Sequence, residues 1–382
     1  NRESEQANSG MTGLASWKAM AGRCRTENDM FGGWLMLDKL SRDLLEEVIG
    51  EEIPEELVEA AGIIELDKLQ GFGWTMNVAP PMLEDRIMVY GPGMMSRFFP
   101  AVINEVSNLP ELMKMLPHDS WQTLMMAADF EEVGVALKQC VDLVMDMNGE
   151  GIPEEVENFL SVAYALLAES GPVVCSNARM EDYSRGLPGD LWLQARHPEK
   201  VTEALAALPG ELNEALDNGM SFMPGMPSVM LAVRGNRLAI FESISPPSSQ
   251  SLGTLAEFQS ASRLYSKFPV SEVYATKFWH RDALIDAMNT MRSEGNDLLS
   301  LIGDTSGTPV DFTMLPDAAA LQALMPSAAS VSTVCAEGFY LEGPSPFGRI
   351  ATSILIRIPP ALKMMSSFGL ISTSSEFSEE EF

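Results

Sequence analysis

The chain has 382 residues, of which 46% are hydrophobic and 21% charged, so its composition is that of a folded protein with two domains or one extended repeat body. It carries 25 Lys and Arg against 54 Asp and Glu, a formal net charge of −29. Such a charge repels phosphate backbones and anionic lipid headgroups. It argues against nucleic acid and favours other protein subunits, basic protein surfaces or cations as partners. No run of about 18 apolar residues occurs, so no transmembrane segment is predicted.

Four stretches of the sequence repeat one local pattern, in which a short apolar strand and a charged corner lead into an amphipathic helix. In chain order, the predicted strands and helices are 34–38 with 40–48, 124–129 with 133–144, 191–196 with 201–208, and 274–279 with 283–291. The first two pairs are each followed by an Ile-Pro-Glu-Glu motif, beginning at Ile53 and Ile152. Proline and acidic residues favour the first turn of a helix, so each motif predicts a further helix. We interpret the pattern as an internal duplication.

Strand-like segments follow the helical regions. The clearest are 72–78 and 86–90 around a Pro80-Pro81 turn, and 229–233 and 238–242 around the hairpin signal Arg234-Gly235-Asn236-Arg237. Hairpin-connected strands form antiparallel sheets, which bury one face under helices. The sequence therefore predicts an α+β fold with antiparallel sheets and helices packed on one face, built from about four strand-helix-hairpin units in two pseudo-symmetric lobes.

Changes in composition divide the chain into four parts. We predict an N-terminal extension with a short helix at 1–30, a first α+β lobe at 31–185, a second α+β lobe at 186–370 and an acidic C-terminal tail at 371–382. The boundary between the lobes lies in a polar, turn-rich stretch, 177–188, that separates the second strand-helix pair from the third.

One segment matches the ligand spacing of a helix-loop-helix calcium loop. Asp146, Asn148 and Glu150 supply oxygens at its first, third and fifth positions, and Glu157 stands at the twelfth. Calcium takes six or more oxygen ligands, which carboxylates at this spacing provide. Glu150 is longer than the usual residue at its position, and Pro153 removes an amide, so a purely structural motif is the alternative. No other cofactor is predicted.

A second segment combines glycine, proline and methionine in a loop. Met220, Phe222, Met223 and Met226 have no regular element in which to bury their side chains, so we predict a contact surface for a subunit or an apolar ligand. Most of the 26 methionines are interpreted as core residues instead.

No signature of a known catalytic class is present in the sequence. Gly-x-Ser-x-Gly, Gly-x-Gly-x-x-Gly and Walker motifs are missing, and the four cysteines contain no Cys-x-x-Cys pair, which leaves buried thiols or disulfides as their interpretation. The run His118-Asp119-Ser120 has the residue types of a triad, but adjacent side chains do not converge on one another. His197 and His280 occupy equivalent corners after the third and fourth strands, where we expect capping or packing.

The chain resembles large exported bacterial proteins classed as domains of unknown function. The resemblance is carried by the strand-Asp-helix pattern and by phrases such as Leu315-Pro316-Asp317-Ala318 and the Glu-Gly-Phe-Tyr-Leu-Glu run at 337–342. It implies export and duplication, and no catalytic residues. The sequence starts at Asn1 without a methionine or an apolar signal core, which fits either an exported protein after processing, periplasmic or extracellular, or a shortened start.

The function expected from these patterns is that of a non-enzymatic exported protein, a structural or accessory subunit that joins a larger assembly through its surface. Two alternatives stay open. The first is a carrier of an apolar small molecule or lipid, for which methionine and phenylalanine side chains would line the cavity. The second is a calcium-dependent or carboxylate-based hydrolase.

Overall fold

The computed structural model shows an α+β protein built on one large antiparallel sheet. It describes residues 15–24, 29–36, 55–148, 154–184, 189–207, 231–243, 246–302, 312–314 and 316–345. Within this part of the chain, eleven strands follow one another in the sheet in the order β1-β2-β3-β11-β10-β9-β4-β5-β6-β8-β7. The strands are β1 (Asp29–Met36), β2 (Gly71–Ala79), β3 (Met82–Tyr90), β4 (Ser120–Ala127), β5 (Ser170–Arg179), β6 (Asp190–Ala195), β7 (Ala232–Arg234), β8 (Arg237–Phe241), β9 (Val273–Trp279), β10 (Ala328–Cys335) and β11 (Gly338–Ser345).

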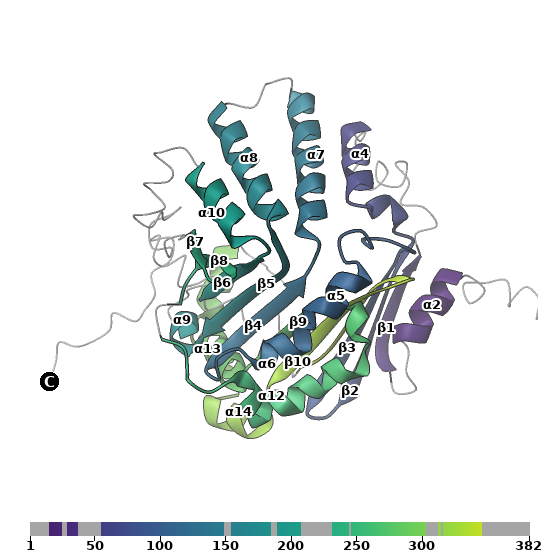
Figure 1. Cartoon of the computed structure of the whole chain (residues 1–382). Coiled ribbons are helices and arrows are strands. Elements are labelled where there is room, and N and C mark those ends of the chain that lie inside the picture. Colours follow the sequence, from purple (N-terminus) through teal and green to yellow (C-terminus); the bar gives the residue numbers. More distant parts are fainter. Residues whose placement is uncertain are drawn as a thin grey trace, which may run out of the picture.

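Helices surround the sheet. The α-helices are α2 (Ala15–Cys24), α4 (Glu55–Ile63), α5 (Ala101–Ser107), α6 (Leu109–Lys114), α7 (Phe130–Asn148), α8 (Glu154–Ala168), α9 (Met180–Ser184), α10 (Pro198–Ala206), α12 (Ala256–Ala261), α13 (Arg281–Ile302) and α14 (Ala318–Leu324). Short 3₁₀ helices are η2 (Leu66–Lys68), η3 (Leu252–Thr254), η4 (Ser262–Lys267), η5 (Val270–Glu272) and η6 (Phe312–Met314). In Figure 1, α4, α7, α8 and α10 stand in a row beyond one end of the strands, and α5, α6 and α12 cross the near face of the sheet.

Most of the predicted local pattern is confirmed. β4 leads into α7, β6 into α10 and β9 into α13, as the repeated strand-helix pattern predicts. The short N-terminal helix is α2, and the turns at Pro80-Pro81 and Gly235-Asn236 join β2 to β3 and β7 to β8. The first predicted strand lies in β1, whereas its helix at 40–48 and the tail at 371–382 lie outside the described residues.

The division into two lobes is not confirmed. Strands from the two predicted lobes alternate across the sheet: β1–β3 are followed by β9–β11, then by β4 and β5, and finally by β6–β8. β3 pairs with β11, and β4 pairs with β9, so both pairings cross the predicted boundary near residue 185. Antiparallel pairing between distant segments thus joins the predicted lobes into one sheet.

Helices pack on both faces of the sheet, which corrects the prediction of one covered face. Phe278 and Trp279 are neighbours on β9 and therefore point to opposite faces. Phe278 belongs to the largest buried cluster, together with residues of α6 and α12 such as Met113 and Phe258. Trp279 packs instead against α13 and α14, where Leu284 is buried. A strand that is apolar on both faces fits a central position in the sheet.

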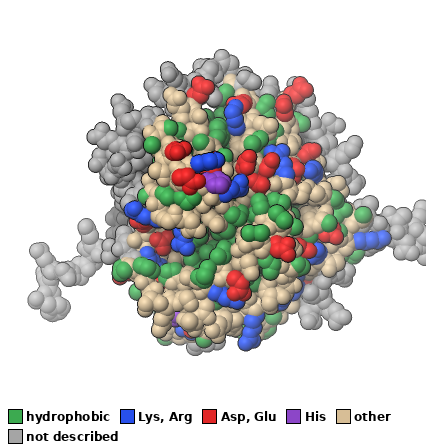
Figure 2. All heavy atoms as spheres, in the orientation of Figure 1, with side chains coloured by type: hydrophobic (Ala, Val, Ile, Leu, Met, Phe, Trp, Pro, Cys, Tyr) green, Lys and Arg blue, Asp and Glu red, His purple; other side chains and the backbone are tan. Residues whose placement is uncertain are grey.

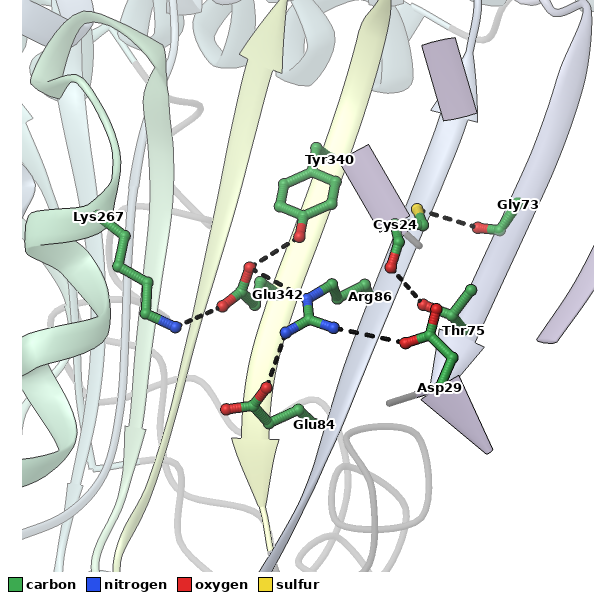
Figure 3. Close-up of polar contacts among 9 residues, drawn as sticks. All are labelled: Cys24, Asp29, Gly73, Thr75, Glu84, Arg86, Lys267, Tyr340 and Glu342. Atoms are coloured by element: carbon green, nitrogen blue, oxygen red, sulfur yellow. Dashed lines mark hydrogen bonds and ion pairs between the residues drawn. The ribbon is translucent and has the colours of Figure 1, made fainter. Parts of the chain in front are cut away.

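A row of polar side chains runs across four neighbouring strands, β1, β2, β3 and β11. Thr75, Arg86 and Glu342 stand directly opposite one another on β2, β3 and β11. Asp29 from β1 and Lys267 from η4 extend this row, which we call the Arg86 row (Figure 3). The side chains of Arg86 and Glu342 are only 11% and 7% exposed. A buried charge is tolerated when it is paired and hydrogen-bonded, as it is here.

Glu342 is the most heavily engaged member of the Arg86 row. Its carboxylate accepts hydrogen bonds from the Lys267 ammonium at 2.8 Å and from the Tyr340 hydroxyl at 2.7 Å. Arg86 Nε lies 3.6 Å from the same carboxylate, and its Nη2 donates to Glu84 at 2.7 Å. The pKa of the Tyr340 hydroxyl is raised, first by burial and then by the neighbouring Glu342 charge. The register between β3 and β11 is therefore fixed by charge as well as by backbone pairing.

We expect Glu342→Gln to lower the free energy of unfolding by about 3 kcal/mol, because it leaves a buried guanidinium without one of its carboxylates. The measurement is urea denaturation followed by far-UV circular dichroism. Glu111→Gln is the matched control, since Glu111 forms an exposed i,i+3 pair with Lys114. An exposed pair contributes at most about 1 kcal/mol. Equal midpoints for the two variants would contradict a stabilising role for the Arg86 row.

Candidate functional site

A cavity of about 430 Å³ opens on the sheet where β5, β6 and β8 lie side by side. Its remaining walls come from the segment 115–117, which connects α6 to β4, and from 247–251, which leads from β8 toward α12. The volume falls in the range typical of small-molecule sites. The cavity is therefore the candidate functional site, and we call it the β5–β8 pocket.

The sheet register brings the polar residues of the pocket together. Asn177 and Arg179 are two residues apart on β5, so their side chains share one face, as in any extended strand. Asn177 stands opposite Asp190 on β6, and Trp192 follows on the same face of β6. Gly235 turns the β7–β8 hairpin with a φ of 62°, a conformation that glycine adopts without strain. The hairpin then places arginines of β7 and β8 at the mouth of the pocket.

Backbone hydrogen bonds hold the wall formed by 247–251. Leu252 N donates to Leu116 O at 2.6 Å, and His118 N donates to Gln250 O at 2.9 Å. The Ser248 amide also donates to the Asp119 carboxylate at 3.3 Å. The segment 247–251 therefore pairs antiparallel with 116–118, the connection between α6 and β4. This pairing fixes the outer wall of the pocket to that connection.

The deep end of the pocket contains buried polar groups that lack hydrogen-bond partners. Asn177 is 1% exposed and Arg179 is 3% exposed. Neither side-chain atom of the Asn177 amide, nor Arg179 Nε or Nη1, has a hydrogen-bond partner among the described residues. The nearest carboxylates of Arg179 are at ion-pair distances, 3.6 Å for Asp190 and 3.9 Å for Asp182. An unsatisfied buried polar group costs about 1–3 kcal/mol, and here several such atoms lie together in the lining of one cavity.

Two further guanidinium groups stand nearer the mouth. Arg237 lies over the Trp192 ring at 4.2 Å, a cation–π contact that fixes its plane. Arg234 Nε pairs with Glu242 at 3.2 Å. Arg237 is therefore the pocket guanidinium without a carboxylate partner in the described part of the chain. Because the chain as a whole is strongly acidic, three arginines around one cavity are a local exception.

Apolar side chains complete the lining. Trp192 and Phe241 come from the sheet, and Met115 and Leu116 come from the segment after α6. On the face of the molecule drawn in Figure 2, acidic and basic side chains are interspersed with hydrophobic side chains. The pocket thus offers hydrogen-bond donors and acceptors at one end and apolar surface beside them, which suits a small molecule with both characters.

The predicted calcium ligands are only partly described. Helix α7 continues through Asn148, so Asp146 and Asn148 belong to its last turn, while Glu157 is exposed near the start of α8. Glu150 lies outside the described residues, and so do the side chains of Asp146 and Asn148. Within the described residues, no cluster of three His, Cys, Asp or Glu side chains has the arrangement of a metal site. Calcium binding stays a prediction, and so does the calcium-dependent or carboxylate-based hydrolase.

The predicted contact loop is likewise untested, because Met220, Phe222, Met223 and Met226 all lie outside the described residues. The prediction for His280 is confirmed: its Nδ1 accepts the Asp282 amide at 3.2 Å at the start of α13. Burial lowers the pKa of this imidazole, and the Asp282 charge partly opposes that shift. The residue is a helix cap, as its position after β9 indicated.

In the triad-like run 118–120, Ser120 and Asp119 each form a hydrogen bond with a different partner. The Ser120 hydroxyl donates to Pro117 O at 2.6 Å, and the Asp119 carboxylate accepts the Ser248 amide. The side chains therefore do not form a catalytic relay.

Comparisons with protein-family models, curated proteins and solved structures found no match to this chain. Among the described helices, none combines the length and the apolar character needed to cross a membrane. The site must therefore be interpreted from its own geometry.

Sequence reasoning missed the β5–β8 pocket. Its polar residues are single positions on three strands, with no spacing that a motif describes, and they meet only through strand register. The one available signal was the hairpin turn, where Arg234 and Arg237 flank Gly235-Asn236. Arginines on both sides of a tight turn in an acidic chain mark a local positive patch.

All four cysteines are unpaired, and two of them are deeply buried. Burial raises the pKa of the Cys24 and Cys175 thiols to about 12; near Cys175, the Arg237 charge opposes this shift without cancelling it. Only a thiolate reacts readily with alkylating reagents. The protonated thiols contribute stability that is complete below pH 9 and is lost as the pH rises toward 12.

We therefore expect iodoacetamide at pH 8.5 to leave Cys24 and Cys175 unmodified in the native protein and to modify both in urea, as peptide mass spectrometry would show. Cys140, which is partly exposed on α7, is the internal control and should be modified first. Rapid native labelling of Cys175 would mean that the sheet beneath the pocket opens readily.

Proposed function

We propose that this protein is a non-enzymatic binding protein for a small polar molecule, which it holds in the β5–β8 pocket. The observation that carries the proposal is the pair Asn177 and Arg179, whose buried polar atoms lack hydrogen-bond partners within the described structure. A ligand in the pocket would complete these hydrogen bonds and offset the cost of leaving the atoms unpaired. The cavity is large enough for an organic molecule.

The pocket favours a polar ligand over the apolar molecule or lipid considered from the sequence. Three guanidinium groups and the Asn177 amide would lose hydration against an apolar ligand without gaining partners. The apolar residues Trp192 and Phe241 provide contact area next to these groups. A carrier function is thus retained with a different ligand chemistry.

The variant Asn177→Leu tests this proposal because a binding residue and a structural residue respond in opposite ways. Replacing an unsatisfied buried amide by an apolar group of similar size should raise the free energy of unfolding of the unliganded protein by about 1–3 kcal/mol. The same change should abolish ligand retention. Urea denaturation gives the stability, and native mass spectrometry after incubation with a mixture of amino acids, 2-hydroxy acids and monosaccharides gives the retention.

The matched control is Thr123→Val. Thr123 stands opposite Asn177 on β4, is equally buried and has a hydroxyl partner in Met113 Sδ at 3.7 Å. Loss of the Thr123 hydroxyl should not stabilise the protein and should leave ligand retention unchanged. If Asn177→Leu destabilises the protein and wild type retains no compound, the proposal is wrong.

A second candidate function, a subunit of a larger assembly, is favoured by an apolar surface on α5. Val102 and Val106 are one helical turn apart and are 69% and 79% exposed. Apolar groups that project together from a helix are typical of protein contacts. The contact loop at Met220–Met226 belongs to the same proposal.

We expect the double variant Val102→Glu with Val106→Glu to fold normally and to elute as a monomer, whereas the wild-type protein in native material elutes with partners. Size-exclusion chromatography with light scattering is the measurement. Lys114→Glu changes the net charge by the same two units on the neighbouring helix and should leave the elution unchanged. A wild-type protein that is monomeric in native material would remove this candidate.

Two further parts of the proposal concern history and location. We propose that the sheet arose from about four copies of a strand-helix-hairpin unit; the antiparallel groups β1–β2–β3, β9–β10–β11 and β6–β8–β7 support this origin. Each group contains a strand, an intervening helix and a returning hairpin. We also propose that the protein is exported, periplasmic or extracellular, where binding proteins and assembly subunits meet their ligands.

A further inference from the structure

The hydrogen-bonding groups at the deep end of the pocket determine which functional groups a polar ligand must carry. The Asn177 amide offers one donor group and one acceptor, and this holds whichever way the amide is oriented. Arg179 adds donors at Nε and Nη1. The ligand must therefore bring acceptors for the guanidinium and the amide nitrogen, and also a donor for the amide oxygen. One small molecule can reach both groups, since Asn177 and Arg179 are on one face of β5.

Charge decides which acceptor and donor these are. Around Arg179 stand two carboxylates, Asp182 at 3.9 Å and Asp190 at 3.6 Å, and of these Asp190 lines the pocket. Asp182 is fully buried, accepts the Arg179 amide at 3.2 Å and accepts the Ser243 hydroxyl at 2.6 Å. A simple anion would lie beside the Asp190 carboxylate, and a simple cation would leave the guanidinium donors without acceptors.

Near the mouth stand two guanidinium groups. Arg234 is neutralised by Glu242, but Arg237 is held on Trp192 with no carboxylate beside it in the described residues. The pocket therefore presents the Asp190 carboxylate at one end and the Arg237 guanidinium at the other. A molecule that carries one positive and one negative group satisfies both, and its own net charge is zero.

We infer that the ligand is a zwitterionic α-amino acid with an apolar side chain, its ammonium group facing Asp190 and the Asn177 carbonyl and its carboxylate facing the Arg179 and Arg237 guanidinium groups. The inference rests on the proposed function and names its ligand class. An α-amino acid brings an ammonium donor and a carboxylate acceptor together in one small molecule. Its side chain contacts Trp192 and Phe241, which line the same cavity.

Isothermal titration calorimetry with three matched probes tests the inference. L-phenylalanine carries both charged groups, 3-phenyllactate replaces the ammonium by a hydroxyl, and phenethylamine lacks the carboxylate. We expect L-phenylalanine to bind at least ten-fold more tightly than either analogue. Because each buried charged group left without its partner weakens binding strongly, the two analogues should both fail.

Two variants assign the charged groups. Asp190→Asn should remove the preference for L-phenylalanine over 3-phenyllactate, because the amide no longer favours an ammonium group. Arg237→Gln should weaken the binding of L-phenylalanine at least ten-fold and leave the affinity for phenethylamine unchanged. Arg196→Gln is the control, since Arg196 is partly exposed and pairs with Glu131 outside the pocket; its affinity should equal that of wild type.

The outcomes separate this inference from the proposed function. If 3-phenyllactate or glucose binds wild type and amino acids do not, the pocket is a binding site but the ligand class is wrong. Tight binding that survives both Asp190→Asn and Arg237→Gln would also overturn the inference. If none of the probes binds and the metabolite mixture leaves no adduct, the proposed function and this inference fail together.

Discussion

Arg86 on β3 and Glu342 on β11 face each other although they come from opposite ends of the described chain. They lie in the antiparallel ladder between β3 and β11, which joins the first three strands to the last three. Gly338 allows the approach, since a Cβ at this position would collide with the Val89 carbonyl and its φ of 132° suits only glycine. The charged pair is buried, so any slip in register would leave unpaired charges in the protein interior.

The same sheet distributes its polar groups unevenly. In the Arg86 row, Glu342 accepts two hydrogen bonds and Arg86 donates one to Glu84, so the row holds strands together. In the β5–β8 pocket, buried polar atoms of Asn177 and Arg179 lack hydrogen-bond partners in the described part of the chain. The first arrangement contributes stability, whereas the second reduces it unless another molecule is bound. Arg86 Nη1 also lacks a hydrogen-bond partner in the described residues, so the two sets of side chains differ in the number of unsatisfied atoms, and this difference supports the proposed binding site.

Local structure was predictable where one short segment contains its own signal. The Arg234–Arg237 hairpin, the Pro80-Pro81 turn and the His280 corner were all identified from adjacent residues, and short apolar segments indicated the central strands. The covered faces were mispredicted because Phe278 and Trp279 are both apolar, and periodicity does not say how many layers a strand lies between.

By itself the sequence determined the α+β character, the strand-helix steps and the acidic surface, because each depends on composition or on residues within one turn or strand of each other. Only the tertiary structure decided the order of strands, and with it the alternation of the two predicted lobes in one sheet. It also decided the site. Asn177, Asp190 and Arg237 become neighbours through the register of three strands, and register is a property of pairing between distant segments that no local pattern encodes.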